Sequence, residues 1–180
     1  IDDVEVDGLY AEGCHSAVRL LANAYPVRRV SISNVYGTYY QYCIGISRFY
    51  RASHTGYFDG LVIKNIFASK EFRHSKYERD RQEEFPYLWL EKDVNVHDLH
   101  ISDVYRREEN VAITTLFIEK RARVDSLLFE NVFFENLLDT PAPVIENHGS
   151  VGKFTIRNVR TSGGELFVNE GTVDELVAEA

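Results

Sequence analysis

The sequence contains no methionine, no long apolar run and too few basic residues to balance its acids. No stretch approaches about 18 consecutive apolar residues, so we predict no membrane-spanning helix. The formal net charge of −8 argues against a general nucleic-acid-binding protein, because that affinity depends on a surplus of lysine and arginine facing phosphates. The only two cysteines, Cys14 and Cys43, are predicted to be free, half-buried thiols.

The lack of methionine also bears on the extent of the chain. The sequence starts in mid-pattern with IDDVEVDGLY, so we expect a segment of a longer protein, with any signal peptide upstream of Ile1. Its 180 residues are 44% hydrophobic and 13% aromatic, which is enough for one domain with a sizeable core. We therefore predict that residues 1–180 form a single domain.

One short pattern recurs along the chain. Apolar residues alternate with other residues, and each stretch then reaches a turn residue that is followed at once by another apolar residue. This period of two, with β-branched residues at the alternating positions, predicts strands rather than helices. The turn position is occupied by Gly8, Asn34, Asn65, Asp103, Asn131 and Asn158, and the position two residues earlier by Ile32, Ile63, Ile101, Phe129 and Ile156 in the last five repeats.

A second, shorter strand is predicted before each of these stretches. The last residue of the shorter strand lies 11 residues before the next turn residue, as from Asn23 to Asn34, whereas the rest of the repeat varies from 11 to 27 residues. Each repeat therefore has a fixed strand–turn–strand half and a variable half that holds the loops. The shorter strands are expected within residues 16–23, 43–49, 86–92, 112–120, 142–149 and 164–171.

Repeats of this length bury their apolar faces by stacking, which predicts a solenoid. The pattern favours an all-β fold, a right-handed parallel β-helix of about six coils. The isoleucines would form an interior file. The asparagines would lie at turns, in the left-handed backbone conformation, and form hydrogen bonds with one another along the stack.

Over essentially the whole chain, these repeats resemble the pectin-lyase-like superfamily of right-handed β-helices. YYQYCIGISR, residues 39–48, is similar to a strand of polygalacturonase-like glycoside hydrolases, and ENHGSVGK, residues 146–153, is similar to another of their stretches. The resemblance implies an extracellular or cell-surface protein that binds a polysaccharide or oligosaccharide. We expect no cofactor and no metal, and neither nucleic acid nor membrane as a partner.

The resemblance also implies catalytic carboxylates just before the first strand of a coil. In the matching coil those positions hold Gln41 and Tyr42, which are not carboxylates. We therefore expect the catalytic set two coils later, at Glu108 and Glu109, joined by Asp139 from the next coil. The alternative is that these are solvated acids at loop ends.

Hydrolase and lyase chemistry remain to be separated. A lyase of this superfamily needs Ca²⁺ held by several acidic oxygens and a basic residue to abstract a proton. Arg106 and Arg107 supply the basic residue, but no dense aspartate cluster accompanies them, so we favour a hydrolase.

A stretch rich in tyrosine and arginine provides the predicted substrate-binding residues. Tyrosine offers a flat apolar face to a sugar ring, and arginine forms paired hydrogen bonds with a carboxylate. This combination favours an acidic, uronate-type glycan, although the tyrosines would equally pack a loop against the coil. The predicted set is Gln41, Tyr42, Arg48, Tyr50, Arg51, His54 and Arg107.

Two further interpretations complete the sequence analysis. His97 and His100 have the spacing of helical metal ligands, but on a strand they should point to opposite faces, so no metal site is predicted. A non-catalytic glycan-binding or structural β-helix, as in adhesins or phage tail spikes, is the alternative to an enzyme. Uncapped coils at both ends would then favour self-association or a neighbouring domain.

Overall fold

The computed structural model describes residues 1–48, 53–71 and 85–179, and these form thirteen β strands. No helix in this part of the chain is long and apolar enough to cross a membrane. Seven of the strands form one parallel sheet, called here the long-strand sheet, with the order β1, β3, β5, β7, β9, β11, β13. Their bounds are β1 Asp2–Cys14, β3 Val27–Tyr39, β5 Gly56–Lys70, β7 Val94–Glu108, β9 Arg123–Asn136, β11 Ser150–Thr161 and β13 Thr172–Glu179.

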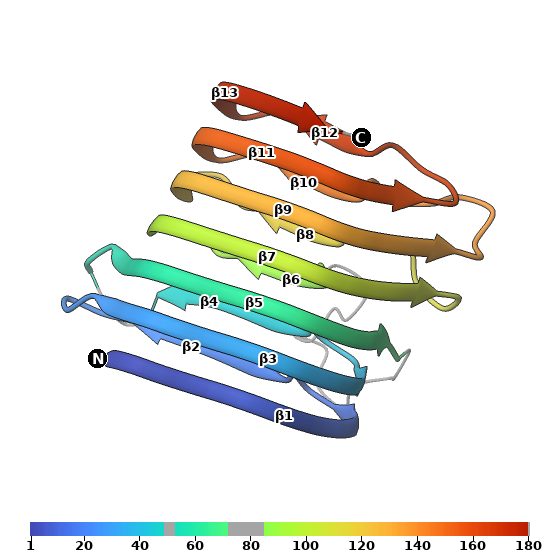
Figure 1. Cartoon of the computed structure of the whole chain (residues 1–180), viewed down its shortest axis with the longest axis horizontal. Coiled ribbons are helices and arrows are strands. Elements are labelled where there is room, and N and C mark those ends of the chain that lie inside the picture. The colour runs from blue at the N-terminus through green and yellow to red at the C-terminus, as the bar shows by residue number, and fades with distance from the viewer. Residues whose placement is uncertain (49–52, 72–84, 180) are drawn as a thin grey trace.

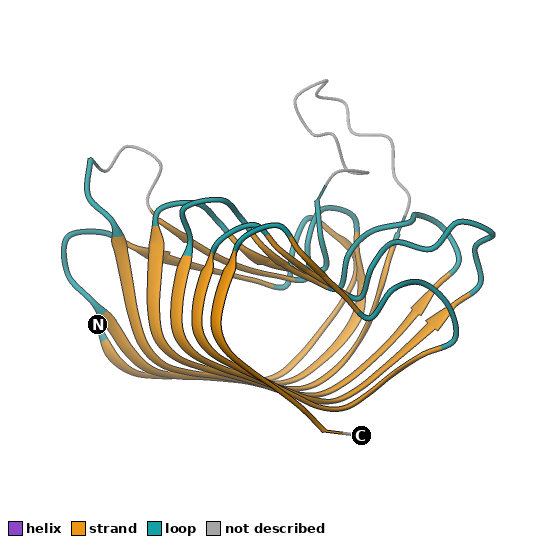
Figure 2. Ribbon diagram, turned by 90° about the horizontal axis from the view of Figure 1, so that it is seen from above, coloured by secondary structure: helices purple, strands orange, loops and turns teal. Residues whose placement is uncertain are grey.

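The other six strands form a second parallel sheet, called here the short-strand sheet. Long and short strands alternate along the chain, and each strand pairs with the equivalent strand of the next turn (Figure 1). Successive turns superpose along one axis (Figure 2), which confirms the predicted parallel β-solenoid, with about five turns. The short strands are β2 Val18–Ala22, β4 Ile44–Arg48, β6 Leu88–Leu90, β8 Leu116–Ile118, β10 Ile145–Asn147 and β12 Phe167–Asn169.

The predicted interior file is confirmed. Its five members pair in register across β3, β5, β7, β9 and β11, and none is more than 3% exposed. Burying a side chain of this size contributes about 1.5–3 kcal/mol. The file therefore forms a continuous apolar column along the solenoid, made of Ile32, Ile63, Ile101, Phe129 and Ile156.

The predicted turn residues are also confirmed. Each has a positive φ, from 46° at Asn158 to 72° at Gly8, and the long strands bend there. The side-chain amide of Asn65 donates to Oδ1 of Asn34 at 3.2 Å, and that of Asn158 donates to Oδ1 of Asn131 at 2.9 Å. Asp103 lies between these two pairs and, as a carboxylate, has no N–H to donate to Asn65.

The constant spacing of 11 residues does not correspond to a constant register. Asn147 pairs with Ile118, whereas the spacing would match Asn147 with Lys120. The turn that joins a short strand to the next long strand therefore changes in length from one repeat to another. The spacing therefore predicted where the strands lie, but not which residues of neighbouring short strands pair with each other.

The expectation that His97 and His100 lie on opposite faces is wrong. Val96 and Leu99 are both buried, so the two residues between them, His97 and Asp98, are both exposed. Two consecutive outward residues form a corner here and interrupt the period of two. Both histidines therefore lie on the outer side, where each contacts an acid of β9.

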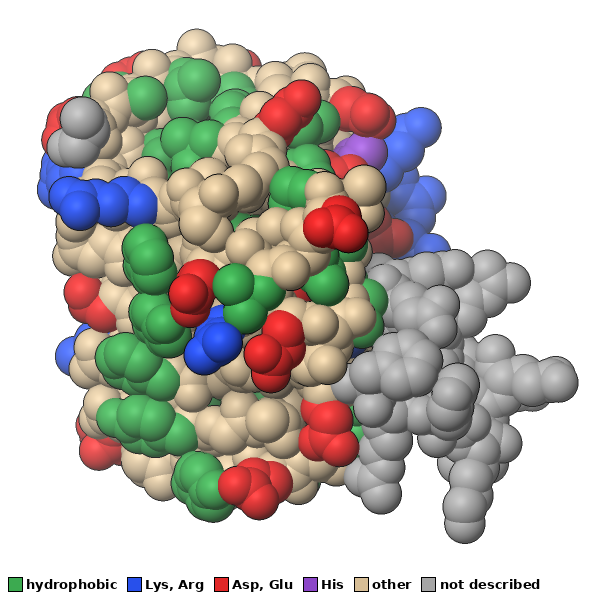
Figure 3. Space-filling view, turned by 90° about the vertical axis from the view of Figure 1, so that its right-hand side faces the viewer, with side chains coloured by type: hydrophobic (Ala, Val, Ile, Leu, Met, Phe, Trp, Pro, Cys, Tyr) green, Lys and Arg blue, Asp and Glu red, His purple; other side chains and the backbone are tan. Residues whose placement is uncertain are grey.

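An aromatic column lies on the outer side of the long-strand sheet. Its members pair in register, and the rings of Tyr36 and Phe67 stack with centroids 5.6 Å apart and planes 8° apart. Figure 3 shows apolar side chains gathered in such a column on this side of the molecule. The rings of Tyr105 and Phe133 stack in the same way, with centroids 5.6 Å apart and planes 17° apart. The column consists of Tyr10, Tyr36, Phe67, Tyr105 and Phe133.

Candidate functional site

The predicted catalytic residue Glu108 lies in the interior, where its side chain is 1% exposed. Its Oε2 accepts a 2.6 Å hydrogen bond from Arg106, and its Oε1 accepts the backbone N–H groups of Asn110 and Val111 at 2.9 Å each. The Arg106 guanidinium is also buried and lies over the ring of Phe134 at 4.7 Å. A carboxylate with these partners holds the loop after β7.

Glu109 and Asp139 lie in a different environment from Glu108, because both are exposed. Glu109 lies 3.9 Å from Arg107, whose Nε lies 3.7 Å from Glu135. Neither Glu109 nor Asp139 lines the cleft described below. The structure therefore does not bring the three predicted carboxylates into one chemical environment.

Gln41 and Tyr42, which precede β4, are buried, with exposed fractions of 7% and 2%. The Tyr42 ring packs against Trp89 and Phe85, with centroids 5.4 Å and 5.9 Å away, and burial raises the pKa of Tyr42. Tyr42 therefore supports neighbouring rings and does not itself present a face to solvent.

The remaining predicted binding residues are placed as follows. Arg48, at the end of β4, lies 3.2 Å from Asp93, so its charge already has an acidic neighbour. His54 is exposed. Tyr50 and Arg51 lie outside the described residues.

The outer face of the short-strand sheet brings together a different set of polar and aromatic residues. One file of outward positions runs in register through β2, β4, β6, β8, β10 and β12. The next outward positions lie two residues further along the chain, just past the ends of β6, β8, β10 and β12, and they carry acids and one histidine. The first file is Arg19, Gly45, Trp89, Phe117, Glu146 and Val168, and the second, the acidic file, is Glu91, Glu119, His148 and Glu170.

A cleft with a volume of about 210 Å³ opens beside this face. Small-molecule pockets usually measure about 300–1,000 Å³, so this one would hold only part of a longer ligand. Its walls come from the segments that precede β6, β8 and β10, and the cleft therefore crosses three turns of the solenoid. The lining residues are Pro86, Ala112, Ile113, Thr114, Phe117, Ala142, Pro143 and Glu146.

Glu91 is the carboxylate with the most perturbed environment on this face. Its side chain is 18% exposed, and its Oε2 has no hydrogen-bond partner among the described residues. Burial raises the pKa of Glu91, the charge of Glu119 raises it further, and Arg19, 4.0 Å away, opposes the rise. Such a carboxyl group keeps its proton to a higher pH than an exposed one.

His148 is held between two carboxylates. Its Nε2 lies 2.7 Å from Glu146, and its Nδ1 lies 3.1 Å from Glu170. Glu146 also accepts a 2.8 Å hydrogen bond from the hydroxyl of Thr114, which lines the cleft. The orientation of the Glu146 carboxylate at the edge of the cleft is thus fixed from both sides.

No protein-family model, curated protein or solved structure matches this chain. The fold defines the chain as a parallel β-solenoid, and membership of the pectin-lyase-like superfamily stays a prediction.

Sequence analysis missed the residues that this face brings together. A signal was present, because LWLE at 88–91 and LFIE at 116–119 repeat one order of apolar, aromatic, apolar and acidic residues. Alternation on a strand places the ring and the acid of each motif on the same outer face. The two motifs could therefore have predicted a file of rings beside a file of carboxylates.

Proposed function

We propose that the chain binds a polysaccharide along the outer face of the short-strand sheet and acts on it as a glycoside hydrolase. The observation that carries this proposal is that two adjacent turns each present a ring and a carboxylate on this face. One turn carries Trp89 and Glu91, and the next carries Phe117 and Glu119. Aromatic side chains contact the apolar faces of sugars, and carboxylates accept hydrogen bonds from their hydroxyl groups.

The direction of the ligand follows from the direction of stacking. Neighbouring parallel strands lie about 4.8 Å apart, so equivalent side chains recur at that interval along the axis. Because the cleft also crosses three turns, an extended chain parallel to the axis would contact several turns at once. A single compact ligand would use only a fraction of this surface.

The acid–base assignment rests on the two different environments of the carboxylates. Glu91 is largely buried, and its raised pKa suits a general acid that protonates the leaving oxygen. Glu119 occupies the equivalent position on the next turn, and its Oε2 accepts the backbone N–H of Lys92 at 3.0 Å. This hydrogen bond holds the Glu119 carboxylate in a fixed orientation beside Glu91, which suits the nucleophile or base.

The charge of this face favours an uncharged glycan over a uronate. Glu91, Glu119, Glu146 and Glu170 lie on it, whereas Arg19 and His148 supply its positive or titratable nitrogen groups. The preference for acidic glycans that the sequence predicted depends on Arg48 and Arg51. The first of these already faces Asp93, and the second lies outside the described residues.

The proposal is tested by calorimetric titration with neutral and acidic oligosaccharides of equal length, combined with an assay for released reducing ends. We expect Trp89→Ala to weaken binding about fivefold or more, since an aromatic ring stacked on a flat ligand such as a nucleobase contributes roughly 1–3 kcal/mol. Glu91→Gln should keep binding and lose hydrolysis. Tyr105→Ala, which removes an exposed ring from the aromatic column, is the matched control and should change neither.

The outcomes separate the alternatives. Binding without hydrolysis in the wild type would support a non-catalytic glycan-binding solenoid. Tighter binding of acidic than of neutral oligosaccharides would restore the uronate prediction. If Trp89→Ala bound as tightly as the wild type while melting at the same temperature, this face would not be the binding site.

A further inference from the structure

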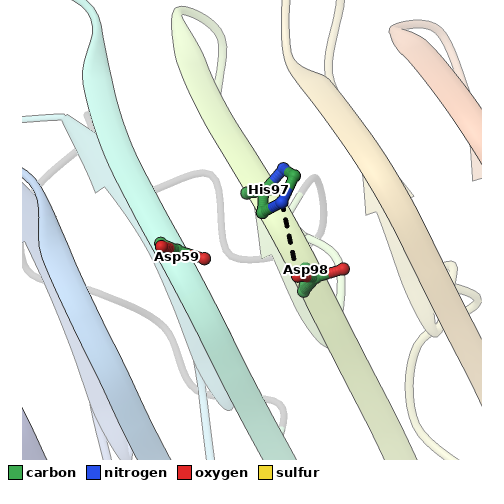
Figure 4. A group of neighbouring side chains, drawn as sticks. All are labelled: Asp59, His97 and Asp98. Carbon is green, nitrogen blue, oxygen red and sulfur yellow. Dashed lines mark ion pairs between the residues drawn. The ribbon is translucent and has the colours of Figure 1, made fainter.

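A cluster of possible metal ligands lies at the corner of the long-strand sheet, away from the residues assigned above. Asp59 comes from β5, and His97 and Asp98 come from β7. Each offers one ligand atom, and these atoms all lie within 4.8 Å of one another. Figure 4 shows the three side chains on the two neighbouring strands.

The corner explains how consecutive residues join one site. On a regular strand His97 and Asp98 would point to opposite faces. Here both are exposed, because the buried positions on either side are Val96 and Leu99. The backbone thus places two ligands of β7 beside the one from β5.

The orientation of the imidazole matches that of a metal-bound histidine. Nδ1 of His97 lies 3.1 Å from Oδ2 of Asp125, which suits an N–H that donates to the carboxylate. In the neutral imidazole with its hydrogen on Nδ1, the other nitrogen, Nε2, carries the lone pair; it lies 3.6 Å from Asp98, too far for a hydrogen bond. Metal-ligating histidines typically donate their second N–H to a carboxylate in this way.

Asp125 is in turn held in place from outside the cluster. Its Oδ1 accepts a 2.9 Å hydrogen bond from Arg123, so one oxygen faces the guanidinium and the other faces the imidazole. Arg123, Asp125 and His97 thus form a chain of contacts that fixes the imidazole ring. The support that a metal ligand requires is therefore present.

We propose that Asp59, His97 and Asp98 bind a divalent transition-metal ion such as Zn²⁺, with Asp125 as the positioning residue for His97. One imidazole nitrogen and two carboxylate oxygens are a donor set that Zn²⁺ accepts, and water completes the coordination. Calcium and magnesium prefer oxygen ligands alone, so they should bind more weakly. The ion would cross-link β5 to β7 and neutralise acids that otherwise repel one another.

The experiment is a titration of the whole chain with ZnCl₂, followed by calorimetry and by the melting temperature. We expect one site whose affinity falls at least about tenfold in His97→Ala, and roughly 10–100-fold in Asp125→Asn. His100→Ala is the matched control, because His100 lies on the same strand but faces Glu130 at 2.9 Å. Zn²⁺ should raise the melting temperature of the wild type and of His100→Ala, and not that of His97→Ala.

Three results would overturn the proposal. One is an absence of Zn²⁺ binding at millimolar concentration, and another is equal affinity in the wild type and His97→Ala. The third is binding that survives in His97→Ala but disappears in His148→Ala, which would place the ion on the short-strand sheet. Because both histidines are accessible to solvent, their variants should fold, and the melting temperature without zinc checks this.

Discussion

The two sheets of the solenoid carry outer faces of different kinds. On the long-strand sheet, like side chains stack on like, and the aromatic column repeats a ring on five successive turns. On the short-strand sheet, the equivalent file changes from turn to turn, and the acidic file places Glu91 beside Glu119.

The difference has an energetic meaning. Stacked aromatic pairs across neighbouring strands contribute about 0.2–1 kcal/mol each, whereas like charges directly opposite each other destabilise a sheet. The aromatic column is therefore accounted for by its contribution to stability. The adjacent carboxylates lower the stability of the sheet, so we expect them to be present for a functional reason.

The largest effect should come from the interior that both faces share. Replacing Ile101 by Asp places a charge at a position that is 0% exposed, between Ile63 and Phe129. We expect a loss of more than about 4 kcal/mol, enough to unfold the solenoid, measured by urea denaturation. Asn65→Ala, which removes a turn hydrogen bond and puts alanine at a positive φ, should cost only about 2 kcal/mol. Equal losses in the two variants would contradict the assignment of interior and turn.

The next effect tests whether the aromatic column stabilises the fold. Phe67→Ala removes ring contacts with Tyr36 at 5.6 Å and with Tyr105 at 6.4 Å. We expect the free energy of unfolding to fall by about 1–2 kcal/mol, with glycan binding unchanged. Tyr10→Ala, at the end of the column, is the control and should cost less. A loss of glycan binding in Phe67→Ala would show that the column is itself a ligand surface.

The fold was predictable from sequence because every turn repeats the same physical requirement. A buried Ile32 must lie above a buried Ile63, and a left-handed residue such as Asn34 must follow at a fixed distance. The register of the short strands was less predictable, since pairing depends on turns whose lengths differ. Asn147 against Ile118 is the clearest case.

The candidate site was harder to predict, because burial decides the role of a carboxylate. Glu108 and Glu109 are neighbours in the sequence, yet one is enclosed with Arg106 and the other is exposed. Inward and outward side chains alternate at the end of β7, so the two carboxylates point to opposite sides. The sequence does not show that Arg106 is buried beside Glu108. The metal cluster was missed for a related reason, since the corner at His97 and Asp98 breaks the period of two on which the sequence argument relied.

A smaller effect should follow from removing the charge of Glu91. Burial raises the pKa of Glu91, so the folded chain holds this proton more tightly than the unfolded chain does. Stability is therefore lost as pH rises from the ordinary pKa of this carboxyl through its raised value. Glu91→Gln should gain about 0.2–1 kcal/mol over the wild type at neutral pH, since a like-charge pair with Glu119 disappears.

The pH dependence gives the control for this variant. The advantage of Glu91→Gln over the wild type should grow as pH rises from the ordinary pKa of a glutamate through the raised pKa of Glu91 and then stay level, as measured by urea denaturation at each pH. Glu109→Gln, at an exposed carboxylate, should show no such growth. An advantage that shrinks with rising pH would mean that ionised Glu91 stabilises the fold and that burial does not dominate its environment.

The smallest effect concerns the asparagine turns. Two hydrogen-bonded asparagine pairs lie along the solenoid, and Asp103 separates them. Asp103 accepts a 3.2 Å hydrogen bond from Asn131, but it cannot donate to Asn65 on the turn before it. Asp103→Asn supplies that donor, so we expect a gain of about 0.5 kcal/mol in the free energy of unfolding, because an exposed hydrogen bond contributes little. The same substitution in an Asn65→Ala background lacks the acceptor and should gain nothing. If Asp103→Asn raised the free energy of unfolding equally in both backgrounds, the gain would come from removing a negative charge. A hydrogen bond that links the two asparagine pairs would then contribute nothing.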